Sequence, residues 1–134
     1  MIELYLSIAK KLHEIPGLAL VDIEGTNEAK LYPAAFISLG DLPYEQLGGG
    51  TAIASFPFQV KIELSPKHRS GSNSPVLDAL LESFSVVADA RNKLTKEDVD
   101  YIGGIMLTGE SLKKKDGKYE AVLKFIGNVE YSPD

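Results

Sequence analysis

The sequence contains no cysteine and only two histidines, His13 and His68. The absence of cysteine excludes disulfide bonds, thiol nucleophiles, iron–sulfur clusters and thiolate zinc sites, and it is consistent with a reducing compartment. The two histidines do not form a His-x-x-x-His pair, so a histidine zinc site would need both of them together with distant carboxylates. We therefore expect no metal site and no other cofactor.

A surplus of basic residues is also missing. The chain has 14 lysines and arginines against 19 aspartates and glutamates, a net charge of −5 at pH 7. Nucleic-acid-binding proteins normally carry a basic surplus, because neutralising phosphates supplies most of their affinity. The small cluster Lys113–Lys115 is interpreted as the solvated end of a hairpin. We expect no specific binding to nucleic acid.

Long apolar runs are absent as well. No segment approaches the roughly twenty apolar residues that a membrane-spanning helix needs. The N-terminal stretch MIELYLSIAKKLHEIPG has Glu3 within its apolar part and its lysines after that part. This arrangement is typical of an amphipathic helix rather than a signal peptide. We expect a soluble protein with no membrane partner and no secretion by a signal-peptide route.

The motifs that carry catalysis are not present. Gly48-Gly49-Gly50-Thr51 lacks the Gly-Lys-Ser/Thr end and the following helix of a phosphate-binding loop, so we interpret it as a flexible loop. The stretch from Ser70 to Ser74 is not a nucleophile elbow, and it precedes a predicted helix as a cap does. Asp98, with Asp100 or Glu97, is explained by an exposed turn. We predict no enzymatic activity and no catalytic residues.

The composition is that of a single globular domain covering residues 1–134. Hydrophobic residues make up 44% of the chain and charged residues 25%, close to the average for folded domains. The strand FPFQVKIEL alternates apolar and polar residues strictly, which places one of its faces in the core and the other in water. A solvated sheet face favours an antiparallel or mixed sheet over a doubly wound parallel one.

Periodicity and turn signals predict two helices and five strands. The helices are expected over residues 2–14 and from Pro75 onward, and the strands over residues 18–23, 34–39, 56–64, 101–110 and 119–131. Thr95–Asp98 is predicted to cap a separate short turn, and Gly127 to mark a bulge. Asp116-Gly117 indicates a hairpin between the last two strands. The predicted fold is an α+β domain of order α-β-β-β-α-β-β, with a mixed or antiparallel sheet of about five strands and both helices packed on one face.

Two apolar features exceed what this fold needs. A helix lying on one sheet requires an apolar stripe of only about 100°. The apolar face of the first helix is wider than this. The loop between the second and third predicted strands, from Gly40 to Ser55, is long and rich in glycine, and loops of this kind are usually functional. It either folds back over its own core or docks on a partner, and the wide helix face meets either a long loop or another subunit. The candidate contact residues are Leu4, Ile8 and Ile15 on the helix and Leu42, Tyr44, Leu47 and Ile53 on the loop.

The order of these elements resembles the tail-completion, or tail-terminator, proteins of tailed bacteriophages and related phage-like particles. The resemblance rests on the first helix ending in IPGL, the strand YPAAFISLG with its Tyr32-Pro33-Ala34-Ala35 entry, the strand FPFQVKIEL, the helix SPVLDALLESF and the closing hairpin strand KYEAVLKFIGNVEY. It covers nearly the whole chain and is one of element order and pattern, with no catalytic motif involved.

The resemblance implies a non-enzymatic structural protein without a cofactor. Such a protein forms a homo-oligomeric ring, commonly a hexamer, which caps the head-proximal end of the tail tube and joins it to the head. Its partners would be further copies of itself, the tail tube protein and the head–tail connector proteins. Its location would be the virion tail, assembled in the cytoplasm of the bacterial host. By position, the Leu42–Ile53 loop would face the tube and the wide helix face would lie between subunits.

Two other interpretations stay open on the sequence alone. One is a small α+β domain that binds a ligand or effector in a pocket between its helices and its sheet. The other is a hydrolase or isomerase with a site that the motifs do not reveal.

Overall fold

The computed structural model describes residues 1–24, 31–65, 75–115 and 117–131. Their elements, in chain order, are α1 (Ile2–His13), β1 (Leu20–Ile23), β2 (Ala34–Leu39), β3 (Glu45–Gly48), β4 (Thr51–Leu64), α2 (Pro75–Lys96), β5 (Ile105–Lys115) and β6 (Lys118–Tyr131). The predicted α+β class is confirmed. The order α-β-β-β-β-α-β-β differs from the prediction by one strand, β3, which brings the sheet to six strands.

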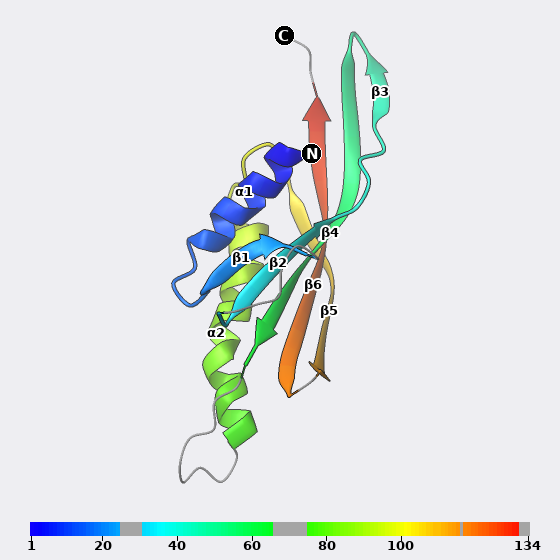
Figure 1. The fold of residues 1–134 in the computed structure, drawn as a ribbon. Helices are drawn as coiled ribbons and strands as arrows, with labels where there is room; N and C mark the ends of the chain where they lie inside the picture. Colours follow the sequence, from blue (N-terminus) through cyan, green and yellow to red (C-terminus); the bar gives the residue numbers. More distant parts are fainter. Residues whose placement is uncertain (25–30, 66–74, 116, 132–134) are drawn as a thin grey trace.

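The sheet has the strand order β1-β2-β4-β6-β5, and β3 pairs with β4 outside this path. The β1–β2 pair is parallel and the other pairs are antiparallel, so the sheet is mixed, as predicted. The two longest strands, β4 and β6, stay in register from Ala52 opposite Tyr131 to Leu64 opposite Tyr119. Their upper ends, together with β3, project past the helices (Figure 1).

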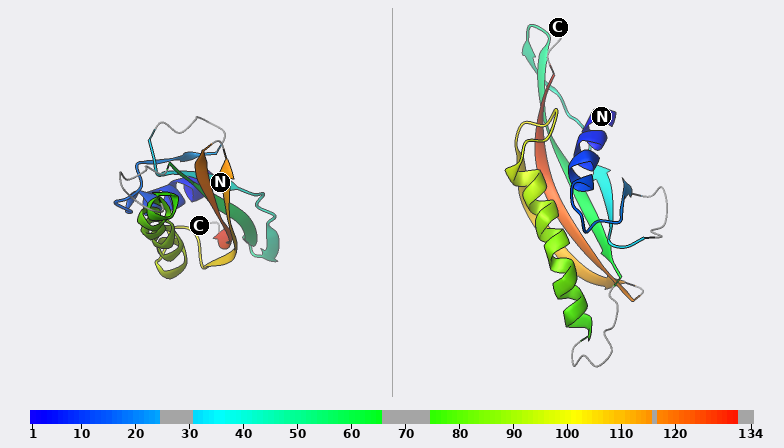
Figure 2. Two further views of the ribbon diagram at one scale, coloured as in Figure 1. Left: turned by 90° about the horizontal axis from the view of Figure 1, so that it is seen from below. Right: turned by 90° about the vertical axis from the view of Figure 1, so that its left-hand side faces the viewer.

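Both helices cover the same face of the sheet (Figure 2). The core forms between them and the alternate side chains of β4, which are buried from Ala52 to Leu64. Three phenyl rings lie at its centre, where Phe58 stacks on Phe56 at 5.6 Å and on Phe125 at 5.0 Å between ring centroids. The opposite face of the sheet carries no helix among the described residues and is called the outer face below.

The buried stripe of α1 runs through Leu4, Ile8 and Leu12, at the four-residue spacing that aligns side chains along a helix. Ile15, just beyond the helix, is also buried. Ile2 and Leu6, on the other side of the helix, are both exposed, Ile2 to 72%. Apolar residues occur on both sides of α1 in the sequence, and packing on the sheet determines which side is buried.

The second helix is longer than predicted. The Thr95 hydroxyl donates a hydrogen bond to the Arg91 carbonyl at 2.7 Å inside α2, so Thr95 does not cap a separate turn. In the part of α2 whose side chains are described, Val86, Ala90 and Leu94 are buried, whereas Leu81 is exposed. Several residues discussed from the sequence lie outside the described residues, namely the Ser70–Ser74 stretch with its predicted cap, His68 and Asp116.

Two predictions for the last strands were wrong. β5 begins at Ile105, because the chain first makes a turn in which Val99 and Ile102 form an isolated bridge and Tyr101 has a φ of 67°. The irregularity lies in β5, between Leu107 and Gly109, and not at Gly127, which stays in register with Phe56. The predicted final hairpin is present, since β5 and β6 pair down to Lys115 opposite Lys118.

Candidate assembly interface

The segment predicted as a flexible loop is a β-hairpin. Its first strand, β3, pairs with the start of β4, with Glu45 opposite Ile53 and Gly48 opposite Thr51. The two residues of the turn, Gly49 and Gly50, have φ values of 61° and 81°. Positive φ at both central positions is the requirement of a type I′ hairpin turn, and glycine meets it without a steric cost. Gly-Gly between two strand-like runs was the sequence signal for this hairpin.

The hairpin is the outer part of a three-stranded projection. We call residues 44–55 and 128–131 the hairpin arm, which comprises β3, the start of β4 and the end of β6 (Figure 1). Across its outer face, Glu45, Ile53 and Glu130 form one cross-strand row. The arm contains these two glutamates and no lysine or arginine. It is therefore an apolar and acidic projection.

Three of the four predicted loop contacts are exposed on this arm. Tyr44, Leu47 and Ile53 all reach solvent, and Leu47 is 58% exposed. Leu42 precedes the arm and packs partly buried against the core. The sequence left open whether this segment folds back over its own core or is available to a partner. Leu42 folds back on its own domain, whereas Tyr44, Leu47 and Ile53 are exposed to solvent.

The three predicted contact residues of the first helix are placed differently. Leu4, Ile8 and Ile15 are all buried in the core of their own chain, beneath α1. The apolar side chains that α1 exposes are Ile2 and Leu6. Direct contact between a partner and this helix would thus use Ile2 and Leu6, while Leu4, Ile8 and Ile15 hold the helix in place.

A tyrosine-rich hollow of about 260 Å³ lies at the base of the arm. Its lining includes Tyr44, Tyr101 and Tyr131, which are exposed and come from three distant parts of the chain. Tyrosine is enriched in protein interfaces because it offers a large apolar ring and a hydroxyl that can hydrogen-bond. No local sequence pattern links Tyr101 and Tyr131 to the arm, so only the fold reveals this grouping.

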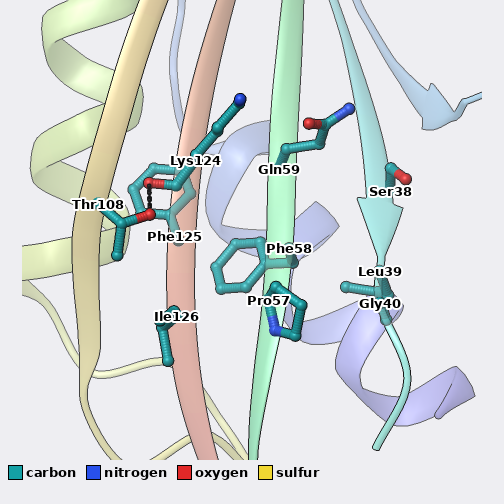
Figure 3. A pocket seen from close by; sticks show the side chains of 10 residues that line it. All are labelled: Ser38, Leu39, Gly40, Pro57, Phe58, Gln59, Thr108, Lys124, Phe125 and Ile126. Carbon is teal, nitrogen blue, oxygen red and sulfur yellow. Dashed lines mark hydrogen bonds between the residues drawn. The ribbon is translucent and has the colours of Figure 1, made fainter.

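A second hollow, of about 400 Å³, opens on the outer face of the sheet (Figure 3). We call it the outer hollow; its lining residues are Ser38, Leu39, Gly40, Pro57, Phe58, Gln59, Thr108, Lys124, Phe125 and Ile126. Lys124 is the one charged residue among them. The Thr108 hydroxyl donates to the Lys124 carbonyl at 3.2 Å across the irregular point of β5. Within the described ranges, no carboxylate lies in ion-pair contact with the Lys124 ammonium.

Two ionisable side chains with shifted pKa values, Glu97 and Lys93, lie elsewhere, where the ends of the two helices meet. The Glu97 carboxylate accepts hydrogen bonds from the ammonium groups of Lys93 and Lys11, each at 3.3 Å, and these bonds lower its pKa. The bond to Glu97 raises the pKa of Lys93 in turn. Glu14 joins the same cluster, 3.5 Å from Lys93. Because every carboxylate here has a lysine partner, the cluster joins α1 to α2 and offers no acid–base pair poised near neutrality.

Other kinds of site find no support in the described part of the chain. There, no group of three or more histidine, aspartate or glutamate side chains is arranged to hold a metal ion. His13 is exposed at the end of α1. No helix in these ranges combines the length and the apolar character needed to cross a membrane.

No family model matches the sequence. The fold, however, is similar to that of a chain in a solved structure described as "Virion of native gene transfer agent (GTA) particle". The two chains superpose with a TM-score of 0.61 at 15% sequence identity, over 96% of this chain and 95% of the other. At this identity the likeness shows a shared fold, and it extends over nearly the full length of both chains.

Proposed function

We propose that this chain is a structural protein of a phage-like particle. The observation that carries the proposal is the end-to-end likeness to a chain of a gene transfer agent virion, with almost nothing left over in either chain. A fold alone does not define a function. Here, however, the site points the same way, because the prominent surface feature is an apolar projection suited to contact with other proteins.

Within such a particle, we infer that the chain is a tail terminator. Copies of it would form a ring, in the resembling family commonly a hexamer, which caps the tail tube and joins it to the head-tail connector. This role needs broad protein-binding surfaces. The hairpin arm and the tyrosine-rich hollow at its base form one such continuous surface. Tyr44 is part of the arm and also lines the hollow.

The contact residues follow from exposure. Tyr44, Leu47 and Ile53 are the arm residues that we assign to contact with another subunit or with the tube. On α1, Ile2 and Leu6 are the side chains available for a neighbour. Leu4, Ile8 and Ile15 act from beneath, because their burial fixes the orientation in which α1 presents the other two.

The length of the tail tube tests the terminator role directly. Particles produced without this chain should carry tubes of uncontrolled length and heads that are not attached to them. Resupply of the wild-type chain should restore both features, and a gold label on the chain should appear at the head–tail junction by electron microscopy. Tubes of normal length on attached heads in its absence would contradict the role. A label along the tube or on the capsid would keep the chain structural but assign it elsewhere.

A further inference from the structure

We propose that the hairpin arm of one copy docks into the outer hollow of a second copy, with the arm glutamates facing Lys124. This inference rests on the proposed function, since it specifies how copies of a ring-forming chain would contact one another. It names two surfaces of the same chain as partners.

The hairpin arm has features suited to docking in the outer hollow. It projects beyond the helices (Figure 1), and its large apolar side chains Tyr44, Leu47 and Ile53 are exposed. In the part of the chain that the structure describes, β3 pairs with β4 alone, so its other edge presents unpaired backbone groups. β3 carries no lysine or proline to block its edge, although it is only four residues long and its pairing with β4 shifts register between Gln46 and Gly48. The long edge strand β5 shows the contrast in charge, since it carries three lysines at its end and β3 carries none.

The outer hollow has the complementary features. Pro57 and Ile126 contribute apolar lining, and Lys124 and Gln59 contribute polar groups (Figure 3). An apolar segment that filled this space would remove water from around the Lys124 ammonium, which is unfavourable unless a carboxylate arrives with it. The arm supplies carboxylates on both sides of Ile53, from Glu45 and Glu130, and brings no positive charge. The two surfaces therefore carry charges of opposite sign.

The shape of the chain requires that this contact be made between copies. Residues of β4 belong to both surfaces, Thr51–Ser55 to the arm and Pro57–Gln59 to the hollow. Because one continuous strand connects them in register with β6, the arm does not bend back into its own hollow. An arm-to-hollow contact joins two different surfaces, so it repeats from copy to copy and closes into a ring when the rotation allows.

Charge reversal tests the contact. The arm variant is Glu45→Lys with Glu130→Lys, and the hollow variant is Lys124→Glu. Each variant alone brings like charges together and should need on the order of 10-fold or more protein to assemble than the wild type. An equimolar mixture should assemble again, because an arm bearing lysines meets a hollow bearing glutamate at one contact, and the unchanged arm and hollow meet at the next. Lys114→Glu, a reversal of an exposed lysine outside both surfaces, should assemble like the wild type.

Native mass spectrometry and sedimentation velocity measure assembly, and circular dichroism confirms that each variant is folded. Because the chain has no cysteine, an independent check is a disulfide between one copy carrying Leu47→Cys and another carrying Ile126→Cys. Normal assembly of either reversed variant overturns the proposal, and so does a mixture that fails to recover. A wild-type chain that stays monomeric at every concentration and gives no cross-link overturns it as well.

These outcomes separate the inference from the proposed function. If the arm variant assembles normally but no longer limits tube length, the arm contacts the tube, and the docking proposal falls while the terminator role stands. If the mixture recovers assembly but tube length is unaffected by the chain, the docking contact stands and the terminator role falls.

Discussion

The ring of Phe56 occupies the space that a side chain at position 127 would need. A Cβ atom on Gly127 would lie 3.0 Å from both Cε1 and Cζ of Phe56, and 3.1 Å from Cγ2 of Ile102. Phe56 is fully buried and stacks on Phe58, so it has little freedom to move aside. Gly127 therefore serves close packing between β4 and the turn before β5.

Replacing this glycine by alanine should destabilise the fold. We expect Gly127→Ala to lower the free energy of unfolding by about 1–3 kcal/mol, the usual cost of overfilling a packed core. Equilibrium unfolding in urea measures the change. Gly103→Ala is the matched control, because its nearest neighbour would be the Asn128 carbonyl oxygen at 4.0 Å. If both variants unfold at the same urea concentration, the close contact does not matter to stability.

Two isoleucines on α1 test which face of the helix the sheet covers. Ile8 is 0% exposed and Ile2 is 72% exposed. Ile8→Ala should cost about 2–5 kcal/mol of unfolding free energy, through lost burial and the cavity left behind. Ile2→Ala should stay within about 0.5 kcal/mol of the wild type. Thermal or urea unfolding of the monomer separates them, and a similar loss in both would show that Ile2 is also covered.

The lysine–glutamate cluster makes stability depend on pH and salt. The pKa of Glu97 is lowered from 4.5, so its contribution is complete above that value and is lost as the pH falls through the folded-state pKa. The pKa of Lys93 is raised from 10.5, so its contribution is complete below that value and is lost as the pH rises through the folded-state pKa. Both contributions are present at neutral pH.

Glu97→Gln should therefore lower the thermal midpoint at neutral pH and low salt by a small amount. The chain carries a net charge of −5, so removing a negative charge anywhere else should help slightly or do nothing. Asp89→Asn, at an exposed carboxylate of α2, controls for that general effect. The difference between Glu97→Gln and the wild type should shrink in about 1 M salt, which screens exposed charges. It should also shrink below the folded-state pKa of Glu97, and a gap that persists in both conditions would mean that Glu97 acts through packing.

The sequence was sufficient to predict the fold class and most of the strands because their signals are local. Strict alternation in β4 identified its faces, and Pro75 was correctly placed at the start of α2. The prediction failed where two local signals competed. Thr95 fits both a cap and a helix interior, and the long α2 uses it as the latter. Gly49-Gly50 fits both a loop and a tight hairpin, and pairing between β3 and β4 decides in favour of the hairpin.

The candidate interface was less predictable because exposure depends on neighbours that are distant in sequence. Apolar residues surround much of α1, and nothing local shows that Ile8 faces the sheet while Leu6 faces solvent. The outer hollow is harder still, since Pro57, Thr108 and Lys124 come from three strands. The arm was recognised from its apolar residues, which lie in a long, glycine-rich connection between two predicted strands. This signal can be read from the sequence without the structure.

The exposed leucine of the arm offers the sharpest test of its role. Leu47→Ser should leave the unfolding free energy of the monomer within about 0.5 kcal/mol of the wild type, because Leu47 is 58% exposed. It should nevertheless weaken assembly, since truncating an apolar contact residue near the centre of an interface commonly costs about 1 kcal/mol or more of binding. Sedimentation velocity over a range of protein concentrations measures this loss.

Leu112→Ser is the matched control for that variant. Leu112 has nearly the same exposure, 56%, but it lies on β5, outside the hairpin arm and outside the lining of the outer hollow. The same change in hydrophobicity at this position should leave assembly unchanged. An equal loss in both variants would mean that assembly responds to general surface hydrophobicity. A loss confined to Leu112→Ser would place the contact on β5. A loss confined to Leu47→Ser assigns it to the arm, because the residue type is the same and the exposure nearly the same in the two cases.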